Sequence, residues 1–278
     1  MNGQVARMRN VAQISPGIWA GFTDAATGNL AFHVGDEAAA VAARRTALNH
    51  ELAALLGTDV NLAYMNQVHG STVAHVGGDH RPARINPAVD VPTADALVAA
   101  GGPAAGRGLA VMVADCVPVV LGGHSSLGEP VVAVAHAGRQ GVELNVVAAV
   151  VAQMRAAGAR NIAAQLGPSV CGGCYEVPAA LRRSVGARVP EAFATTSWGT
   201  PALDLPAAVT AQLAQLGIGA VGPQACTMED PRWFSHRRSQ RGAWPEGRFI
   251  GFVAAAPHAR PIRQDNLGST DPGGLFPS

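Results

Sequence analysis

The sequence is poor in charged residues and in cysteine, and it lacks a long uninterrupted apolar segment. Only 14% of its 278 residues are charged and the formal net charge is +1, so electrostatics gives no reason to expect a nucleic acid or an anionic membrane as a partner. The longest stretch without charge, residues 205–228, contains two prolines and three glutamines and is not expected to span a membrane. The N-terminus has no apolar signal-peptide core, and four cysteines are too few for a disulfide framework. We therefore expect a cytoplasmic protein.

Several common catalytic motifs are also missing. The nine histidines include no pair two residues apart, whereas the trinuclear copper clusters of multicopper oxidases depend on repeated His-x-His pairs. His50-Glu51 is followed by Ala54 where a zincin motif needs its second histidine. Neither a P-loop nor a dinucleotide-binding glycine pattern is present. These absences argue against a genuine multicopper laccase, a zincin protease and the common nucleotide-binding enzymes.

The apolar residues, 48% of the chain, predict a large buried core and an α/β fold. Two valine-rich runs, residues 109–116 and 131–138, have the composition of buried strands. Further strands are expected at 161–166 and 249–255, a strand–turn–strand unit at 61–75, and helices at 142–157, 177–185, 204–216 and from an N-cap at Asp36 to Gly57. No linker divides the chain, so we expect one catalytic domain over residues 1–257 and a disordered tail over 258–278.

Each of the two valine-rich runs ends in a reactive side chain. Cys116 ends the first, and His136 stands near the end of the second. His69 has a similar setting, because it follows a β segment and precedes a glycine. Two histidines and one cysteine suit a catalytic zinc site with a fourth position open. The same residues also suit a metal-free site in which Cys116 is a thiolate and a histidine its base, and each could instead be an ordinary core residue.

Several ordered motifs resemble the bacterial laccase-domain, or polyphenol-oxidase-like, proteins that are associated with purine nucleoside phosphorolysis. The resemblance covers most of residues 17–255 and rests on NQVHG (66–70), ADALVA (94–99), VMVADCVPVVL (111–121), AVAHAG (133–138), GPSVCGGCYEV (167–177), FSHRR (234–238) and GR (247–248). It implies a layered α/β sandwich with mixed sheets, similar to deamidating toxins that use a Cys–His pair. It also implies that His69, Cys116 and His136 are zinc ligands and the catalytic centre.

The family activity implied by these motifs is cleavage of adenosine, inosine, guanosine and methylthioadenosine by phosphate, with adenosine deamination as a further activity. Phosphorolysis needs cations for phosphate, and arginine binds phosphate through paired hydrogen bonds. Our candidates for substrate binding are Gln67, Arg45, Arg139 and Arg238, with Arg237 as a further available cation. Each arginine could also be an ordinary surface residue. The sequence is compatible with a monomer or a homodimer.

Two segments depart from the family pattern, which leaves other functions open. Arg139-Gln140 stands where the family has Trp-Arg, and residues 22–28 lack the arginine of the family's N-terminal segment. The alternatives are a Cys–His hydrolase acting on an amide, such as a peptidoglycan precursor, and a non-catalytic nucleoside-binding protein. Cys171-Gly-Gly-Cys174 could be redox-active or half of a zinc site, but no second CxxC follows and Cys226 stands alone. We therefore expect these to be loop cysteines.

Overall fold

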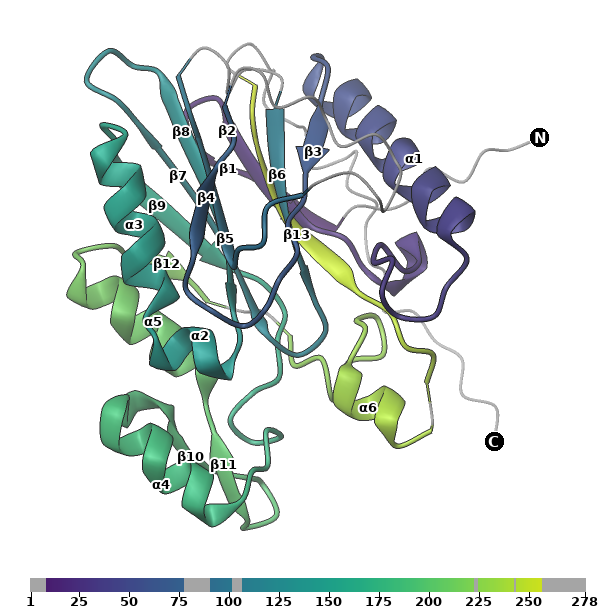
Figure 1. Cartoon of the computed structure of the whole chain (residues 1–278), viewed down its shortest axis with the longest axis vertical. Helices are drawn as coiled ribbons and strands as arrows, with labels where there is room; N and C mark the ends of the chain where they lie inside the picture. Colours follow the sequence, from purple (N-terminus) through teal and green to yellow (C-terminus); the bar gives the residue numbers. More distant parts are fainter. Residues whose placement is uncertain (1–8, 78–90, 102–106, 223–224, 243, 257–278) are drawn as a thin grey trace, which may run out of the picture.

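The computed structural model describes residues 9–77, 91–101, 107–222, 225–242 and 244–256. Their main feature is a pair of mixed β-sheets (Figure 1). The five-stranded sheet has the order β1 (Arg9–Ser15), β2 (Ile18–Phe22), β13 (Phe249–Ala255), β6 (Arg107–Val113) and β3 (Asn61–Ala63). The six-stranded sheet has the order β12 (Ala220–Val221), β9 (Arg160–Leu166), β7 (Val117–His124), β8 (Pro130–Ala137), β5 (Ala96–Ala100) and β4 (Val73–His75). A separate hairpin joins β10 (Phe193–Thr195) to β11 (Pro201–Leu203).

The two sheets pack face to face, and helices cover both outer faces (Figure 1). Apolar side chains of β2, β6 and β13 meet those of β5, β7 and β8 in the central core layer. Helix α1 (Ala38–Leu56) packs on the outer face of the five-stranded sheet, while α3 (Val146–Ala156) and α5 (Leu205–Gln215) cover the six-stranded sheet. Strands buried on both faces need apolar residues at consecutive positions, which explains the valine-rich runs. The predicted layered sandwich with mixed sheets is confirmed.

Most of the predicted elements are present with small changes in their bounds. Strand β13 has the predicted bounds, Asp204 caps α5 by accepting the Ala207 N–H, and the predicted helix at 177–185 is α4 (Ala179–Arg188). The expected helix over 142–157 is wrong as a single helix. It is divided into α2 (Arg139–Glu143) and α3, because Asn145 has a left-handed backbone and caps α3 with its side chain.

One further prediction needs correction. Residue 37, not Asp36, is the N-cap of α1, and Asp36 binds the Arg44 guanidinium instead. The two strands predicted over 61–75 are present as β3 and β4, and they belong to different sheets. The expected tail over 258–278 lies outside the described residues.

The chain crosses repeatedly from one sheet to the other, and three of these crossings position the candidate site. Residues 64–72 connect β3 to β4, and 114–116 connect β6 to β7. A third connection, 222–248, leads from β12 to β13 and contains the short helix α6 (His236–Gln240). Motifs far apart in the sequence therefore meet at the seam between the sheets. Among the described residues, no helix has the length and apolar character that crossing a membrane requires.

Candidate active site and metal-binding groups

His69, Cys116 and His136 come together at the seam between the two sheets. Each offers one potential ligand atom, and these atoms all lie within 4.8 Å of one another. Cys116 Sγ is 3.8 Å from His69 Nε2, and the rings of His69 and His136 meet edge to face with centroids 4.7 Å apart. His136 is buried, Cys116 is partly buried and His69 is exposed. The sequence prediction that these three side chains converge agrees with this arrangement.

Asp95 fixes the orientation of this group. Its carboxylate is fully buried and accepts the backbone N–H groups of His69 at 2.9 Å and Gly70 at 2.6 Å. It also accepts the Nδ1–H of His136 at 2.9 Å, while the His136 N–H donates to the Asp95 carbonyl at 2.7 Å. One carboxylate therefore holds both histidines. With its Nδ1 engaged, His136 can offer Nε2 to a metal, which is the usual carboxylate–histidine–metal arrangement.

The backbone is strained at two points of the site, at His69 itself and at Asp115, the residue before Cys116. His69 has φ 62° and Asp115, which precedes Cys116, has φ 87°. Such values are uncommon for residues other than glycine and persist only where surrounding contacts hold them. Asp115 is held because its carboxylate accepts the Thr227 hydroxyl at 2.7 Å and the Arg237 N–H at 2.8 Å. The third crossing thereby fixes the position of Cys116.

Cys116 and His136 influence each other's ionisation strongly. Burial alone would raise the pKa of Cys116, but the positive charge of His136 and hydrogen bonds from both histidines outweigh it and lower the pKa to about 6. Burial would lower the pKa of His136, but the Cys116 thiolate and the Asp95 hydrogen bond raise it to about 9. Without a metal, the pair is therefore a thiolate next to an imidazolium near neutral pH. A thiolate is also the form in which cysteine binds metals.

The three side chains line a cavity of about 500 Å³. Its wall also contains the two cationic side chains of Arg237 and Arg248 and the histidines His33 and His236. Arg237 stacks on the Tyr175 ring at 4.2 Å and donates to the Glu176 carbonyl. Arg248 donates to Glu246 at 3.2 Å, and its side chain is 17% exposed. The cavity thus combines a metal-capable group with fixed positive charge.

Gln67 lines this cavity, as expected for a substrate contact, but its amide is already engaged. It donates to the Met112 carbonyl at 2.7 Å and accepts the Met112 N–H at 2.9 Å. Its amide thereby pairs with the backbone at the end of β6 and holds residues 64–72 against that strand. A direct contact with substrate remains a prediction.

The three arginines proposed from the sequence are not among the residues that line the cavity. Arg45 lies over the Tyr64 ring at 3.6 Å and donates to the Leu30 carbonyl. Arg139 pairs with Glu143 within α2. Arg238 donates to the carbonyl groups of residues 227, 228, 230 and 233. Each therefore has a structural partner, and their roles in substrate binding remain predictions.

Because Gly138 has no side chain, His69 and Cys116 can lie close to its backbone. A Cβ atom at this position would lie 2.7 Å from His69 Cδ2 and 3.2 Å from Cys116 Sγ. We expect Gly138→Ala to displace the His69 ring and to weaken metal binding about tenfold, as the loss of a positioning contact typically does. Gly219→Ala is the matched control, because a Cβ there meets no atom within 4 Å. Chelator competition measures both affinities, and equal values would contradict this role of Gly138.

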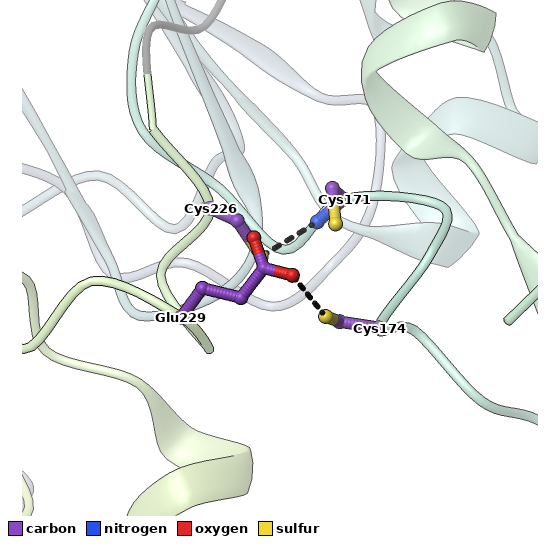
Figure 2. Close-up of side chains that lie close together, drawn as sticks. All are labelled: Cys171, Cys174, Cys226 and Glu229. Atoms are coloured by element: carbon purple, nitrogen blue, oxygen red, sulfur yellow. Dashed lines mark hydrogen bonds between the residues drawn. The ribbon is translucent and has the colours of Figure 1, made fainter. Parts of the chain in front are cut away.

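A second metal-capable group lies outside this cavity. We call it the cysteine cluster, and its members are Cys171, Cys174, Cys226 and Glu229 (Figure 2). Its potential ligand atoms also lie within 4.8 Å of one another. Sequence reasoning missed the cluster because Cys226 is 52 residues beyond Cys174.

A family model described as multi-copper polyphenol oxidoreductase laccase matches residues 14–256. The chain belongs to this family. A relative from Streptomyces coelicolor named purine nucleoside phosphorylase is 46% identical over 81% of this chain and 86% of its own length. A protein of the same name from Mycobacterium tuberculosis is 42% identical over 82% of this chain and 84% of its own. The crystal structure of YlmD from Geobacillus stearothermophilus has 29% identity and a TM-score of 0.72, and it covers 90% of this chain and 99% of YlmD.

These relatives support an enzyme of the nucleoside phosphorylase kind. Because the family model matches residues 14–256, the resemblance inferred from the sequence motifs is confirmed at the level of the family. The family description refers to copper, but neither of the two metal-capable groups among the described residues has the many histidines of a trinuclear copper cluster, since each contains at most two.

Proposed function

We propose that the protein is a zinc-dependent purine nucleoside phosphorylase, with adenosine deamination as a second activity. The proposal rests above all on one observation: His69, Cys116 and His136 line the same cavity as Arg237 and Arg248. The substrates would be adenosine, inosine, guanosine or methylthioadenosine together with inorganic phosphate. The names of the relatives favour this class of reaction.

The residues present fit a zinc ion. Two imidazoles and one thiolate are a suitable donor set for zinc, and three protein ligands leave a fourth position open. The Asp95 carboxylate accepts the Nδ1–H of His136 and so orients its ring. His69, Cys116 and His136 would hold the metal. When bound, zinc would supply Lewis-acid chemistry in the cavity.

In phosphorolysis, the bond between the sugar anomeric carbon and the purine nitrogen breaks, and its electron pair passes to the base. A phosphate oxygen forms the new bond to the anomeric carbon. Arg237 and Arg248 line the cavity, and in this proposal they would bind the phosphate dianion and hold it there. The Tyr175 ring keeps the Arg237 guanidinium fixed, so little side-chain entropy is lost on binding.

Replacing Arg237 by glutamine is expected to lower kcat/KM for phosphate by about 10- to 100-fold, the equivalent of one lost hydrogen bond to a charged group. The KM for nucleoside should change much less. Arg183→Gln, an exposed arginine on α4, is the matched control. Steady-state kinetics at varied phosphate concentration measures the effect. Equal phosphate dependence in the two variants would exclude Arg237 from phosphate binding.

The function itself is tested by metal analysis of the purified protein together with product detection. We expect zinc in the protein, phosphate-dependent release of hypoxanthine from inosine and of adenine from adenosine, and formation of inosine from adenosine. Base release that is independent of phosphate would contradict phosphorolysis. Nucleoside binding without turnover would favour the non-catalytic alternative.

A second candidate function is metal-free hydrolysis of an amide bond. The observation that favours it is the chain Asp95–His136–Cys116, in which the thiolate lies next to an imidazolium that a carboxylate orients. This candidate predicts that the chelated protein keeps its activity and that iodoacetamide abolishes it. Loss of activity on chelation and its return with zinc would exclude it.

A further inference from the structure

The cysteine cluster is formed by two short turns of the same spacing. Cys171 and Cys174 flank two glycines in the first turn, and Cys226 and Glu229 flank Thr227 and Met228 in the second. In each turn the first residue's carbonyl accepts the N–H three residues later, at 3.0 Å from Cys174 and 3.1 Å from Glu229. Paired turns with two intervening residues are the usual framework of structural zinc sites. Here a glutamate occupies the position of the fourth ligand.

The two turns are fixed against each other before any ligand binds. Ser169 and Cys226 form a parallel bridge, in which the Thr227 N–H donates to the Ser169 carbonyl at 3.1 Å. Across the cluster, the Cys171 N–H donates to Cys226 Sγ at 3.4 Å and Cys174 Sγ donates to Glu229 at 3.4 Å (Figure 2). The four ligand atoms therefore face one another from two segments that the fold itself holds together.

The spacing of these atoms suits a tetrahedral ion. With Zn–S distances of ~2.3 Å, neighbouring sulfur atoms in a tetrahedral site are ~3.8 Å apart. The atoms of the cluster all lie within 4.8 Å of one another, so small side-chain rotations would complete the geometry. Three sulfurs favour a soft, thiophilic cation over calcium or magnesium.

We propose that the cysteine cluster is a second, structural metal site that takes one Zn²⁺ ion. Zinc binding would release the three thiol protons to solvent, and Glu229 would complete a closed, four-ligand shell. The cluster shares no residue with His69, Cys116 and His136, so the proposal of this second site does not rest on the proposed function.

The cysteine cluster lies next to Asp115, so a bound ion would stabilise the backbone that precedes Cys116. The first turn is adjacent to Val170, whose N–H donates to the Asp115 carbonyl at 2.9 Å, and the second contains Thr227, whose hydroxyl binds the Asp115 side chain. Both turns thus hold the strained residue that precedes Cys116. The bound ion would join these two turns and fix one wall of the cavity.

Alkylation of the full chain, read by mass spectrometry, tests the proposal residue by residue. After reduction and removal of metal, we expect iodoacetamide to modify Cys171 and Cys226, which are only partly buried, and added ZnSO4 to protect both. A background variant, Cys116→Ala/His136→Ala, isolates this site and should bind about one zinc per chain. Adding Cys226→Ser to that background should remove the bound zinc. Equal alkylation with and without zinc, or no zinc bound by the background variant, would overturn the proposal.

Glu229→Gln covers the case in which loss of a cysteine prevents folding. This variant keeps all three thiols and is expected to bind zinc at least about tenfold more weakly, because a direct ligand contributes no less than an outer-shell partner. Glu129→Gln, an exposed glutamate far from the cluster in sequence, is the matched control. Equal affinity in the two variants would exclude Glu229 as a ligand, and the four-ligand site with it.

Discussion

Cys116→Ala, His69→Ala and His136→Ala are each expected to reduce phosphate-dependent base release to below about 1% of the unmodified protein. Loss of an outer-shell partner of a metal typically costs about 10- to 100-fold, and loss of a direct ligand should cost more. Each variant should also lose the zinc that belongs to this group. Kinetics and metal analysis on the same preparations measure the two effects, and thermal unfolding checks that the fold is retained.

His75→Ala is the matched control for His69→Ala. Both histidines are exposed and lie on neighbouring stretches of chain, but His75 contacts Gln153 and belongs to neither metal-capable group. It should keep its activity and its zinc. Full activity in any of the three site variants would refute the assignment of that residue. Loss of activity with unchanged zinc content would instead assign the side chain to catalysis without metal binding.

The layers of the fold were predictable because burial leaves a direct pattern in the sequence. Strands β8 and β13 are covered on both faces, so their apolar residues are consecutive and their bounds are readily found. Helix α5 shows an acidic N-cap and a proline in its first turn. The break between α2 and α3 depends on the left-handed backbone of Asn145, which no apolar periodicity reveals. The assignment of β3 and β4 to different sheets depends on long-range pairing.

The candidate site was predictable only in part, because some of its residues are marked by local sequence and others are brought together only by the fold. Cys116 and His136 stand where apolar runs end, so local sequence identifies them. Arg237 and Arg248 reach the cavity through the third crossing, and only the folded chain shows which arginines line it. The cysteine cluster joins two turns through a bridge between distant segments. Cys226 gives no signal in the sequence unless its spacing to Glu229 is considered together with the CxxC turn.

Asp95 had a signal that sequence reasoning did not use. It is an acidic residue directly before the apolar strand β5, and a carboxylate at 0% exposure must have a specific partner. Burial would raise the pKa of Asp95, but the hydrogen bonds from His136 and from the Gly70 N–H outweigh it and lower the pKa. The carboxylate is therefore ionised, and it accepts from both segments that present histidines.

Asp95→Asn is expected to weaken zinc binding at this group, and to lower kcat/KM, by about 10- to 100-fold. The asparagine has nearly the same shape, but its NH₂ group would face backbone N–H groups that need an acceptor, and it carries no charge to orient His136. Asp36→Asn is the matched control, because that carboxylate binds Arg44 away from the cavity. Chelator competition on protein that is shown to be folded distinguishes metal binding from stability. If Asp95→Asn bound zinc as tightly as Asp36→Asn, the carboxylate would support only the backbone of residues 68–70, and His136 would owe its orientation to packing alone.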